Sequence, residues 1–585
     1  DAFGWSVALD GDLMAIGARQ DSTGGVSRGA VHLFTGVGAD FSGLTWQKKI
    51  ASGTGTTATP VLSDSDSFGL SIALDGDRLA VGAVSDATGG TNRGAVHLFT
   101  GVGTDFSGLT WQKKLASGTG ATGMPALADS NYFGWSVALD GDRLAVAAVT
   151  DGTAGFSRGA VHLFTGVGSD FSGLTWQKKL ASGAGAIGMP ILADVDWFGS
   201  SLALDGDRLA VGAVGDDTGG SGSGAVHLFT GVGTNFAGLT WQKKLSSGTG
   251  AIGMPTLGDS TQFGWSVALY GDRLAVGTAN LTAPTNGDVV YLFSGIGADF
   301  SGIVWQKSLY SGVGAIGMPN VRFSTTALAL DGERLVVGSS GDGSVHLFTG
   351  VGADFSGLIW QKKLASGTGA IGMPTFGNTD QFGRSVAIDG DRLAVGAPND
   401  STVGTNRGAM YLFSGLSTLG SKVDSPNGAT FANNPDSTSY ITPAIITSLL
   451  DAGTAVTLQA NNDITVLSPV LSSSDMRSPF TLQAGRNINF QANVRTPYGD
   501  LTAVAGDPAA TAQYRDPGVP TITIASGVTL NVLTGTATLA AIGGNIINNA
   551  GDSAISVING FGRWLIYAAD PATSTEGFSG YNKHY

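Results

Sequence analysis

Aspartate pairs around a glycine recur along this chain and are its first candidates for chemistry. The sequence Asp-Gly-Asp stands at 10–12, 75–77, 140–142, 205–207 and 389–391, and Tyr270 and Glu333 replace an acid in two other copies. Repeated carboxylates suggest calcium, but Ca²⁺ takes about six to eight oxygen ligands, and each copy offers only two carboxylates. Asp-Gly is also a strong signal for a tight β-hairpin. We therefore expect hairpins and no cofactor, with calcium as the alternative.

Gly-x-Gly-x-x-Gly is the second repeated motif, at 118–123, 183–188, 248–253, 312–317 and 367–372. A dinucleotide site requires this motif between a strand and a helix. Here Met-Pro usually follows, and the next element expected is another strand. The motif therefore predicts a connector.

Five of the six histidines share one position of a repeat: His32, His97, His162, His227 and His346, with Tyr291 and Tyr411 in two other copies. Tyrosine is not a usual substitute for a zinc-binding histidine, so we predict aromatic side chains packed between repeats. No Ser/His/Asp or paired-carboxylate constellation stands apart from the repeat. We expect no catalytic residue, no metal-binding residue and no enzyme.

Composition excludes several classes of partner. The 585 residues include 92 glycines and no cysteine, and the formal net charge is −14. An acidic, sparsely charged chain is a poor match for nucleic acid or anionic membranes. No apolar run reaches the roughly 18 residues of a membrane helix, so no membrane insertion is expected. Because the chain begins at Asp1 without a signal peptide, we interpret it as a piece of a longer protein.

Seven internal repeats organise the first 416 residues. Their units begin near residues 3, 68, 133, 198, 263, 323 and 382, where Phe-Gly, or Phe323-Ser324, is found. Each unit has four strand-like pieces, which in the third are "GWSVALDG", "DRLAVAAV", "GAVHLFTG" and "LTWQKKLAS". Four short strands repeated seven times predict an all-β, seven-bladed β-propeller. The fourth strand belongs at the outer rim, where its lysines would discourage edge-to-edge aggregation.

The seventh unit lacks a fourth strand in the sequence. No "WQKKL" follows "GAMYLFSGL". Either a segment before Asp1 or something within 417–434 supplies it, or the open edge accepts a strand from another copy.

The phrase "FG…SVAIDGDRLAVGAP" in the last unit resembles the FG-GAP repeat of integrin-α-type seven-bladed propellers. The resemblance covers residues 1 to about 415. It implies a propeller with a binding or adhesive role.

Positions that vary between units indicate where recognition would occur. The loop after the second strand differs in each unit, and the residue after Phe-Gly is Trp5, Leu70, Trp135, Ser200, Trp265 or Arg384. Variable loops on a rigid scaffold often carry binding. Trp5, Trp135, Trp265 and Arg384 are therefore the candidate ligand-surface residues, with local packing as the alternative for the tryptophans.

A second module follows. Residues 417–440 are polar and turn-rich and predict a linker, and "TPAIITSLLDAG" at 442–453 predicts one short helix. Short strands such as "VTLQANNDITV" and "FTLQAGRNINF" predict a C-terminal β-helix-like domain over 441–585. These phrases and "GRWLIYAADPAT" resemble filamentous-haemagglutinin-type large exoproteins of two-partner secretion. That resemblance implies export to the bacterial outer surface or the medium.

Together these observations predict a non-enzymatic surface or secreted adhesin. Its partner would be a protein or glycan of a host or neighbouring cell, or copies of itself. The alternatives are a filament or matrix subunit joined by strand donation at the seventh unit, and a carbohydrate-binding lectin.

Overall fold

The computed structural model divides the chain into two compact units, Asp1–Leu416 and Ser417–Tyr585. It describes residues 1–416 and 443–574, apart from residues 39–40, 104, 169, 280–286, 298, 317, 322, 325, 369, 371–372, 378, 403, 415, 468, 474, 513–514, 516, 558–561 and 570–573. The predicted linker, the cap residue Thr442 and most of the 279–287 loop lie outside the described residues.

Seven antiparallel sheets form the first unit, as predicted. The first four blades are β1 (Phe3–Asp10), β2 (Leu13–Ala18), β3 (Ala30–Thr35) and β4 (Thr45–Ile50); β5 (Phe68–Asp75), β6 (Arg78–Ala83), β7 (Ala95–Thr100) and β8 (Thr110–Leu115); β9 (Phe133–Asp140), β10 (Arg143–Ala148), β11 (Ala160–Thr165) and β12 (Thr175–Leu180); and β13 (Phe198–Asp205), β14 (Arg208–Ala213), β15 (Ala225–Thr230) and β16 (Thr240–Leu245). The remaining three are β17 (Ser266–Tyr270), β18 (Arg273–Gly277), β19 (Val290–Ser294) and β20 (Val304–Leu309); β21 (Thr326–Asp331), β22 (Arg334–Ser339), β23 (Ser344–Thr349) and β24 (Ile359–Ala365); and β25 (Ser385–Asp389), β26 (Arg392–Ala397) and β27 (Ala409–Phe413).

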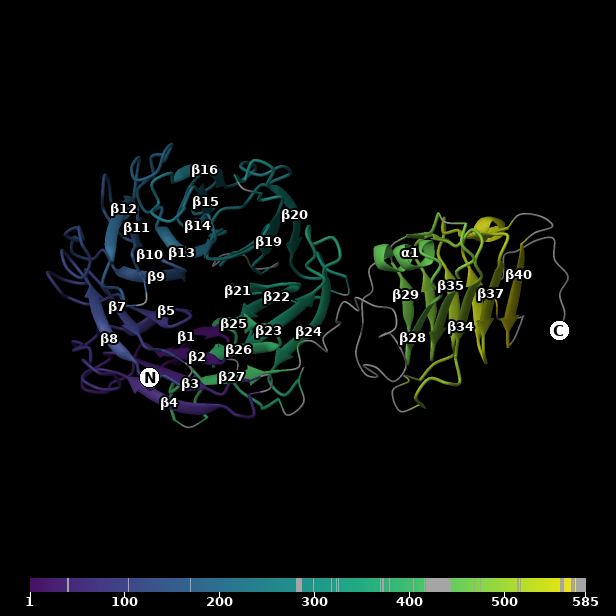
Figure 1. The fold of residues 1–585 in the computed structure, drawn as a ribbon, viewed down its shortest axis with the longest axis horizontal. Coiled ribbons are helices and arrows are strands. Elements are labelled where there is room, and N and C mark those ends of the chain that lie inside the picture. Colours follow the sequence, from purple (N-terminus) through teal and green to yellow (C-terminus); the bar gives the residue numbers. More distant parts are fainter. Residues whose placement is uncertain are drawn as a thin grey trace. The chain divides into compact units, whose positions relative to one another are not determined.

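The blades stand in a ring, each with its first strand toward the centre and its last strand at the rim (Figure 1). Each first strand contacts the first strand of the next blade, and β25 contacts β1. The hydrophobic core lies between blades: one cluster joins Val31 and Leu33 of the first blade to Phe68 and Val81 of the second. A blade therefore buries both faces only because it has two neighbours.

Glycine permits the close approach between blades. Gly29 has a φ of +86°, and a Cβ there would lie 2.1 Å from the carbonyl oxygen of Phe68 in the next blade. Parallel bridges join Gly29 to Phe68, Gly94 to Phe133, Gly159 to Phe198 and Gly224 to Phe263. The repeated Phe-Gly and Gly-Ala-Val phrases thus encode the junctions.

The ring closes through the same contacts that join its internal blades. Phe3 forms the parallel bridge with Gly408 of the last blade. The Ser385 hydroxyl donates to the Gly4 carbonyl (2.9 Å), as the Ser71 hydroxyl does to Gly134 (2.7 Å). Among the described residues, however, the last blade has only three strands, β25 to β27.

The second unit begins with α1 (Pro443–Asp451), which confirms the predicted helix, and continues as a parallel β-solenoid. Successive strands along the chain belong to its three sheets in turn, and every pairing is parallel. The sheets are β28 (Val456–Ala460), β31 (Phe480–Ala484), β34 (Leu501–Ala505), β37 (Thr536–Ala541) and β40 (Arg563–Ala568); β29 (Ile464–Val466), β32 (Ile488–Phe490), β35 (Thr521–Ile524) and β38 (Asn545–Asn548); and β30 (Val470–Leu471), β33 (Val494–Arg495), β36 (Leu530–Leu533) and β39 (Ile555–Val557).

Alternating apolar residues stack inside the solenoid. Leu482, Ala503 and Leu539 lie at equivalent positions of successive coils and are fully buried. On the outer side, the Gln459 amide donates to Gln483 (2.8 Å), and the Gln483 amide to Asp507 (2.9 Å). Stacked side-chain hydrogen bonds of this kind add to the ladder of the backbone.

The closing junction gives a test of the fold. Changing Gly408 to Ala places a Cβ 2.2 Å from the Phe3 carbonyl oxygen, while at Gly390 in the same blade nothing lies within 4 Å. Both glycines have positive φ, so the Gly390→Ala control costs about 1 kcal/mol from backbone strain alone. Gly408→Ala must also separate two blades and should cost roughly 2–3 kcal/mol more. Thermal unfolding measures the difference; equal losses would mean that the ring does not close there.

Candidate functional site

The Asp-Gly-Asp segments are hairpins, as predicted. Asp140 pairs with Arg143 at the end of β9 and β10, and Gly141 in the turn has a φ of +57°. Glycine accepts this left-handed conformation without the penalty that a Cβ imposes.

The first acid of the hairpin links neighbouring blades, and the second holds a loop of its own blade. The Asp140 carboxylate accepts the backbone N–H of Gly206 in the next blade (2.9 Å). Arg143 donates to the Gly206 carbonyl and pairs with Asp140. Asp142 turns the other way and accepts the N–H groups of Gly166 and Gly168 in its own blade. Within the described part of the chain, no three His, Asp or Glu side chains are placed to share a metal ion.

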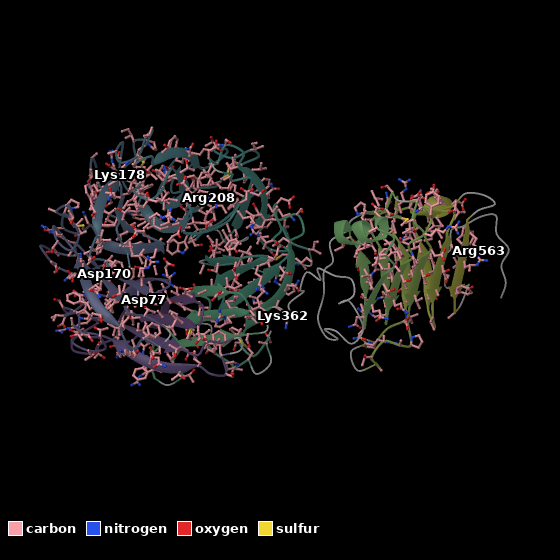
Figure 2. All side chains as sticks on the ribbon, viewed as in Figure 1. Asp77, Asp170, Lys178, Arg208, Lys362 and Arg563 are labelled. Atoms are coloured by element: carbon pink, nitrogen blue, oxygen red, sulfur yellow. The ribbon has the colours of Figure 1, made fainter. Side chains whose placement is uncertain are left out.

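Lysines of the outer strand have partners on neighbouring elements, which adds to the edge-protecting role predicted for them. Lys178, at the outer rim in Figure 2, reaches the Ala237 carbonyl of the next blade (3.3 Å). Lys179 pairs with Asp151 (3.2 Å), which is buried in the loop after β10. The pattern repeats as Lys114–Asp86 and Lys244–Asp216. Their charges tie strands to loops.

Most of the repeated histidines are buried, and Tyr291 at the same position lies in the core cluster that joins the fourth and fifth blades, as predicted. His97 is fully buried, and its ring meets Phe68 edge-on at 5.3 Å. Burial, with Lys114 adding repulsion, lowers the pKa of His97 to about 3. Asp86 partly opposes this effect. The fifth blade loses the arrangement as a unit: Tyr291 replaces the histidine, Ser308 the lysine, and residues 279–287 contain no acid. Such joint loss indicates a packing network and not a ligand set.

The Gly-x-Gly-x-x-Gly segments are connectors, as predicted. Gly118 donates to the Pro125 carbonyl (2.9 Å), and the segment leads from β8 to β9.

The four candidate ligand-surface residues lie at the end of the ring opposite the hairpins, because each stands at the start of a first strand. Trp5 and Arg384 meet across the closing junction, with the Arg384 guanidinium carbon 4.4 Å from the centre of the Trp5 ring. Trp135 is 39% exposed and Trp265 is half-buried, and each belongs to a separate blade. The sequence did not single out Arg19, whose guanidinium carbon lies 3.5 Å from the same Trp5 ring centre.

Three exposed apolar residues that sequence reasoning missed lie on two hydrogen-bonded segments of the third junction. Phe156 of the β10–β11 loop is 71% exposed, and Val195 and Trp197, just before β13, are 38% and 37% exposed. Val195 N–H donates to the Phe156 carbonyl (2.9 Å), which joins the two segments. We call these three residues the Phe156 patch.

The patch departs from the repeat at every position. Equivalent residues are Val26, Thr91 and Ser221 for Phe156; Ser65, Ser130 and Ser260 for Val195; and Ser67, Tyr132 and Gln262 for Trp197. The variation was visible in the sequence, but only the fold brings the three positions together.

Val195 also carries backbone strain. Its φ is +62°, close to +60° at Ser130 and +56° at Ser260. A β-branched residue is an outlier in this region, and strain of this kind tends to persist at functional sites. Between Val195 and Trp197, the buried Asp196 carboxylate accepts the Ala193 N–H (2.8 Å). Burial, with the nearby Asp216 charge adding to it, raises the pKa of Asp196 to about 6.

Polar side chains border the patch. Arg158 Nε lies 2.7 Å from Asp194 Oδ1, and the same oxygen accepts the Phe156 N–H (3.0 Å). An apolar centre with a charged border is the usual build of a protein-binding surface. No helix among the described residues has the length and apolar character to cross a bilayer.

Comparison with known proteins identifies the repeats. A family model described as "FG-GAP repeat" matches residues 1–34, 61–99, 127–164, 192–229 and 377–413. The chain therefore contains FG-GAP repeats, in the first four blades and the last. No curated protein matches the sequence.

Solved structures similar to the chain include three from different organisms. The Cps50 (Swd1) β-propeller domain of Myceliophteria thermophila is 10% identical with a TM-score of 0.38, covering 70% of this chain and 96% of that one. Sqt1 of Chaetomium thermophilum is 15% identical with a TM-score of 0.36 (67% and 79%), and Kuenenia stuttgartiensis hydrazine synthase 11% with 0.38 (70% and 95%). Likeness at this level says nothing about what this chain binds.

The buried histidines predict a specific acid response. A folded-state pKa of about 3 for His97, below the ordinary 6.5 of histidine, means that the unfolded chain binds the proton first as pH falls. The free energy of unfolding should then fall by about 1.4 kcal/mol per pH unit per such histidine between these values. His97→Tyr, the residue of the fifth blade, should flatten the slope by that amount in denaturant titrations from neutral pH to pH 4. An unchanged slope would show that His97 is solvated.

Proposed function

We propose that this chain is a non-enzymatic, extracellular binding protein of the adhesin type, in which the propeller presents the Phe156 patch to a protein on another cell. The observation that supports the proposal most strongly is the exposed cluster of Phe156, Val195 and Trp197, at positions where the other junctions carry mostly small or polar side chains. A repeated scaffold gains an asymmetric surface at this junction.

The energetics favour a binding role for the patch. Exposed clustered apolar residues cost solubility, and on monomeric proteins such clusters tend to mark interaction sites. Trp and Phe at the centre of an interface, with an Arg–Asp pair at the border, match the residues that dominate binding energy. The repeat sets a positive φ at this position, as at Ser65, Ser130 and Ser260. A β-branched valine is less favourable there than serine, so Val195 adds strain that those junctions avoid.

The second module fits a stalk or anchor. A solenoid with a continuous parallel ladder extends by adding coils and has unpaired backbone edges only at its end coils. The resemblance of this region to large bacterial exoproteins supports an outer-surface or secreted location. We assign no cofactor to the function.

The patch can be tested with substitutions that introduce the residue types found at the equivalent positions of the fourth junction. Trp197→Gln and Phe156→Ser install the residues of Gln262 and Ser221. Each should weaken saturable binding of the labelled protein to whole cells by about ten- to a hundredfold, because hot-spot truncations cost roughly 1.4–2.8 kcal/mol. Val61→Thr is the control, since Val61 is 78% exposed outside the patch and Thr256 is its equivalent.

Flow cytometry over a concentration series measures this binding, and thermal unfolding confirms that each variant is folded. Binding that is unchanged in both patch variants contradicts the proposal. Loss of binding after enzymatic removal of cell-surface glycans, with protein partners intact, would favour the lectin alternative.

One observation favours a filament or matrix subunit as a second candidate function. In the complete blades, the third strand is covered by the fourth, whereas β27 is half-buried along its length and no described strand pairs with its outer edge. An unpaired edge can template pairing with another chain.

Sedimentation of the purified chain over a range of concentrations separates the two functions. Strand exchange at β27 predicts oligomers that grow with concentration, because a head-to-tail contact builds rings or open filaments. A monomer at all concentrations removes the filament alternative and leaves the adhesin proposal standing.

A further inference from the structure

Two arginines break the repeat and meet at the closing junction. The position of Arg384 is held elsewhere by uncharged residues: Trp5, Leu70, Trp135, Ser200, Trp265 and Thr325. The position of Arg19 is likewise uncharged, as Val84, Val149, Val214, Ala279, Ser340 and Pro398. Arg384 precedes β25 in the last blade and Arg19 follows β2 in the first, so ring closure alone brings them together.

Both guanidinium groups lie against one tryptophan. The guanidinium carbons of Arg19 and Arg384 lie 3.5 Å and 4.4 Å from the centre of the Trp5 ring. A stacked guanidinium keeps the N–H donors in its plane free for a further partner. Both arginine side chains are half-buried, so these donors are partly removed from water.

No acid among the described residues compensates the two charges. Neither guanidinium has an ion pair in this part of the chain, and Arg19 Nε is buried without a hydrogen-bond partner. Burial lowers the pKa of Arg384 to about 10, with repulsion from Arg19 as the second cause. Two like charges are thus held together at a cost that a bound anion would remove.

We infer that Arg19, Trp5 and Arg384 form a binding site for a carboxylate side chain of the propeller's protein partner. Paired guanidinium groups match the planar carboxylate, which accepts two parallel N–H donors. This inference rests on the proposed function and adds the chemistry of a second contact, in the last and first blades, to the apolar patch between the third and fourth.

The chain's own junctions favour aspartate as the occupant. At the same end of the ring, Arg28, Arg93 and Arg158 each bind an aspartate, Asp64, Asp129 and Asp194 respectively, at 2.7 Å. Those pairs lie within the chain and border the loops. Arg19 and Arg384 are oriented by stacking on Trp5 and have no such acid among the described residues, which is the arrangement expected when the carboxylate comes from outside.

Fluorine NMR of the full chain labelled with 5-fluorotryptophan tests the site. Trp5→Phe assigns the Trp5 resonance. The probes are the peptide Ac-Gly-Asp-Gly-NH₂, its neutral isostere Ac-Gly-Asn-Gly-NH₂, and methyl glucuronide. The Asp peptide should shift the Trp5 resonance saturably, and the Asn peptide should not, because only the carboxylate pairs with both guanidinium groups.

Repeat-derived variants provide the controls. Arg384→Leu and Arg19→Val introduce the residue types found at Leu70 and Val84. Each should lower the affinity for the Asp peptide by at least about tenfold, as expected when one partner of a charge-assisted pair is lost. The remaining tryptophan resonances report folding; if a variant unfolds, Arg384→Lys keeps the charge and removes the fork, and should still weaken the peptide. Equal shifts from both peptides, no shift, or shifts unchanged in the variants overturn the inference. Tighter binding of methyl glucuronide overturns the peptide assignment in favour of an acidic glycan.

The outcome is distinguishable from failure of the proposed function. If the Asp peptide fails while Trp197→Gln still weakens cell binding, only the carboxylate site is wrong. If the peptide binds and the patch variants bind cells normally, the ligand surface lies at the closing junction instead.

Discussion

Close approach of backbones between neighbouring blades is the constraint on which this structure depends. At each regular junction a glycine with positive φ faces the phenylalanine carbonyl of the next Phe-Gly. The gap leaves no room for a Cβ, as at Gly29 and Phe68. Once the blades are this close, the serine hydroxyls, the Asp-Gly-Asp carboxylates and the outer lysines can all reach partners across the junction. The identity of the repeats follows from this geometry, because every blade must present the same two faces.

Departures from the repeat therefore carry the information about function. The fifth blade loses histidine, lysine and aspartate together and keeps its place in the ring, so that network is replaceable packing. The last blade lacks a described fourth strand, yet Ser385, Arg392 and Gly408 close the ring onto the first blade. The third junction instead gains Phe156, Val195 and Trp197, whose apolar side chains are partly or largely exposed. We regard this junction as the ligand-facing part of the propeller.

Local signals made the strands, hairpins and blade count predictable from the sequence. Alternating apolar residues, Asp-Gly turns and fixed spacing are local signals, so they can be recognised without knowing the tertiary contacts. What the acids bind was not predictable, since Asp140 accepts from Gly206, which belongs to another blade. The partners of the outer lysines were not predictable either, since they are a carbonyl of the next blade and an aspartate of their own blade's loop. Trp5 and Arg384 were both singled out, but their contact spans the ring closure. Arg19 had a usable signal, because it is the one charged residue at its repeat position.

Hydrogen exchange on the bound state tests the central claim that the Phe156 patch at the third junction takes part in recognition. The chain contains its own controls. Residues 85–92 are the repeat equivalents of 150–157, and residues 125–132 are those of 190–197. The account predicts that binding to partner cells slows exchange at 150–157 and 190–197 and leaves 85–92 and 125–132 unchanged. Equal protection around the ring, or protection at the Asp-Gly-Asp hairpins of the opposite end, would contradict it.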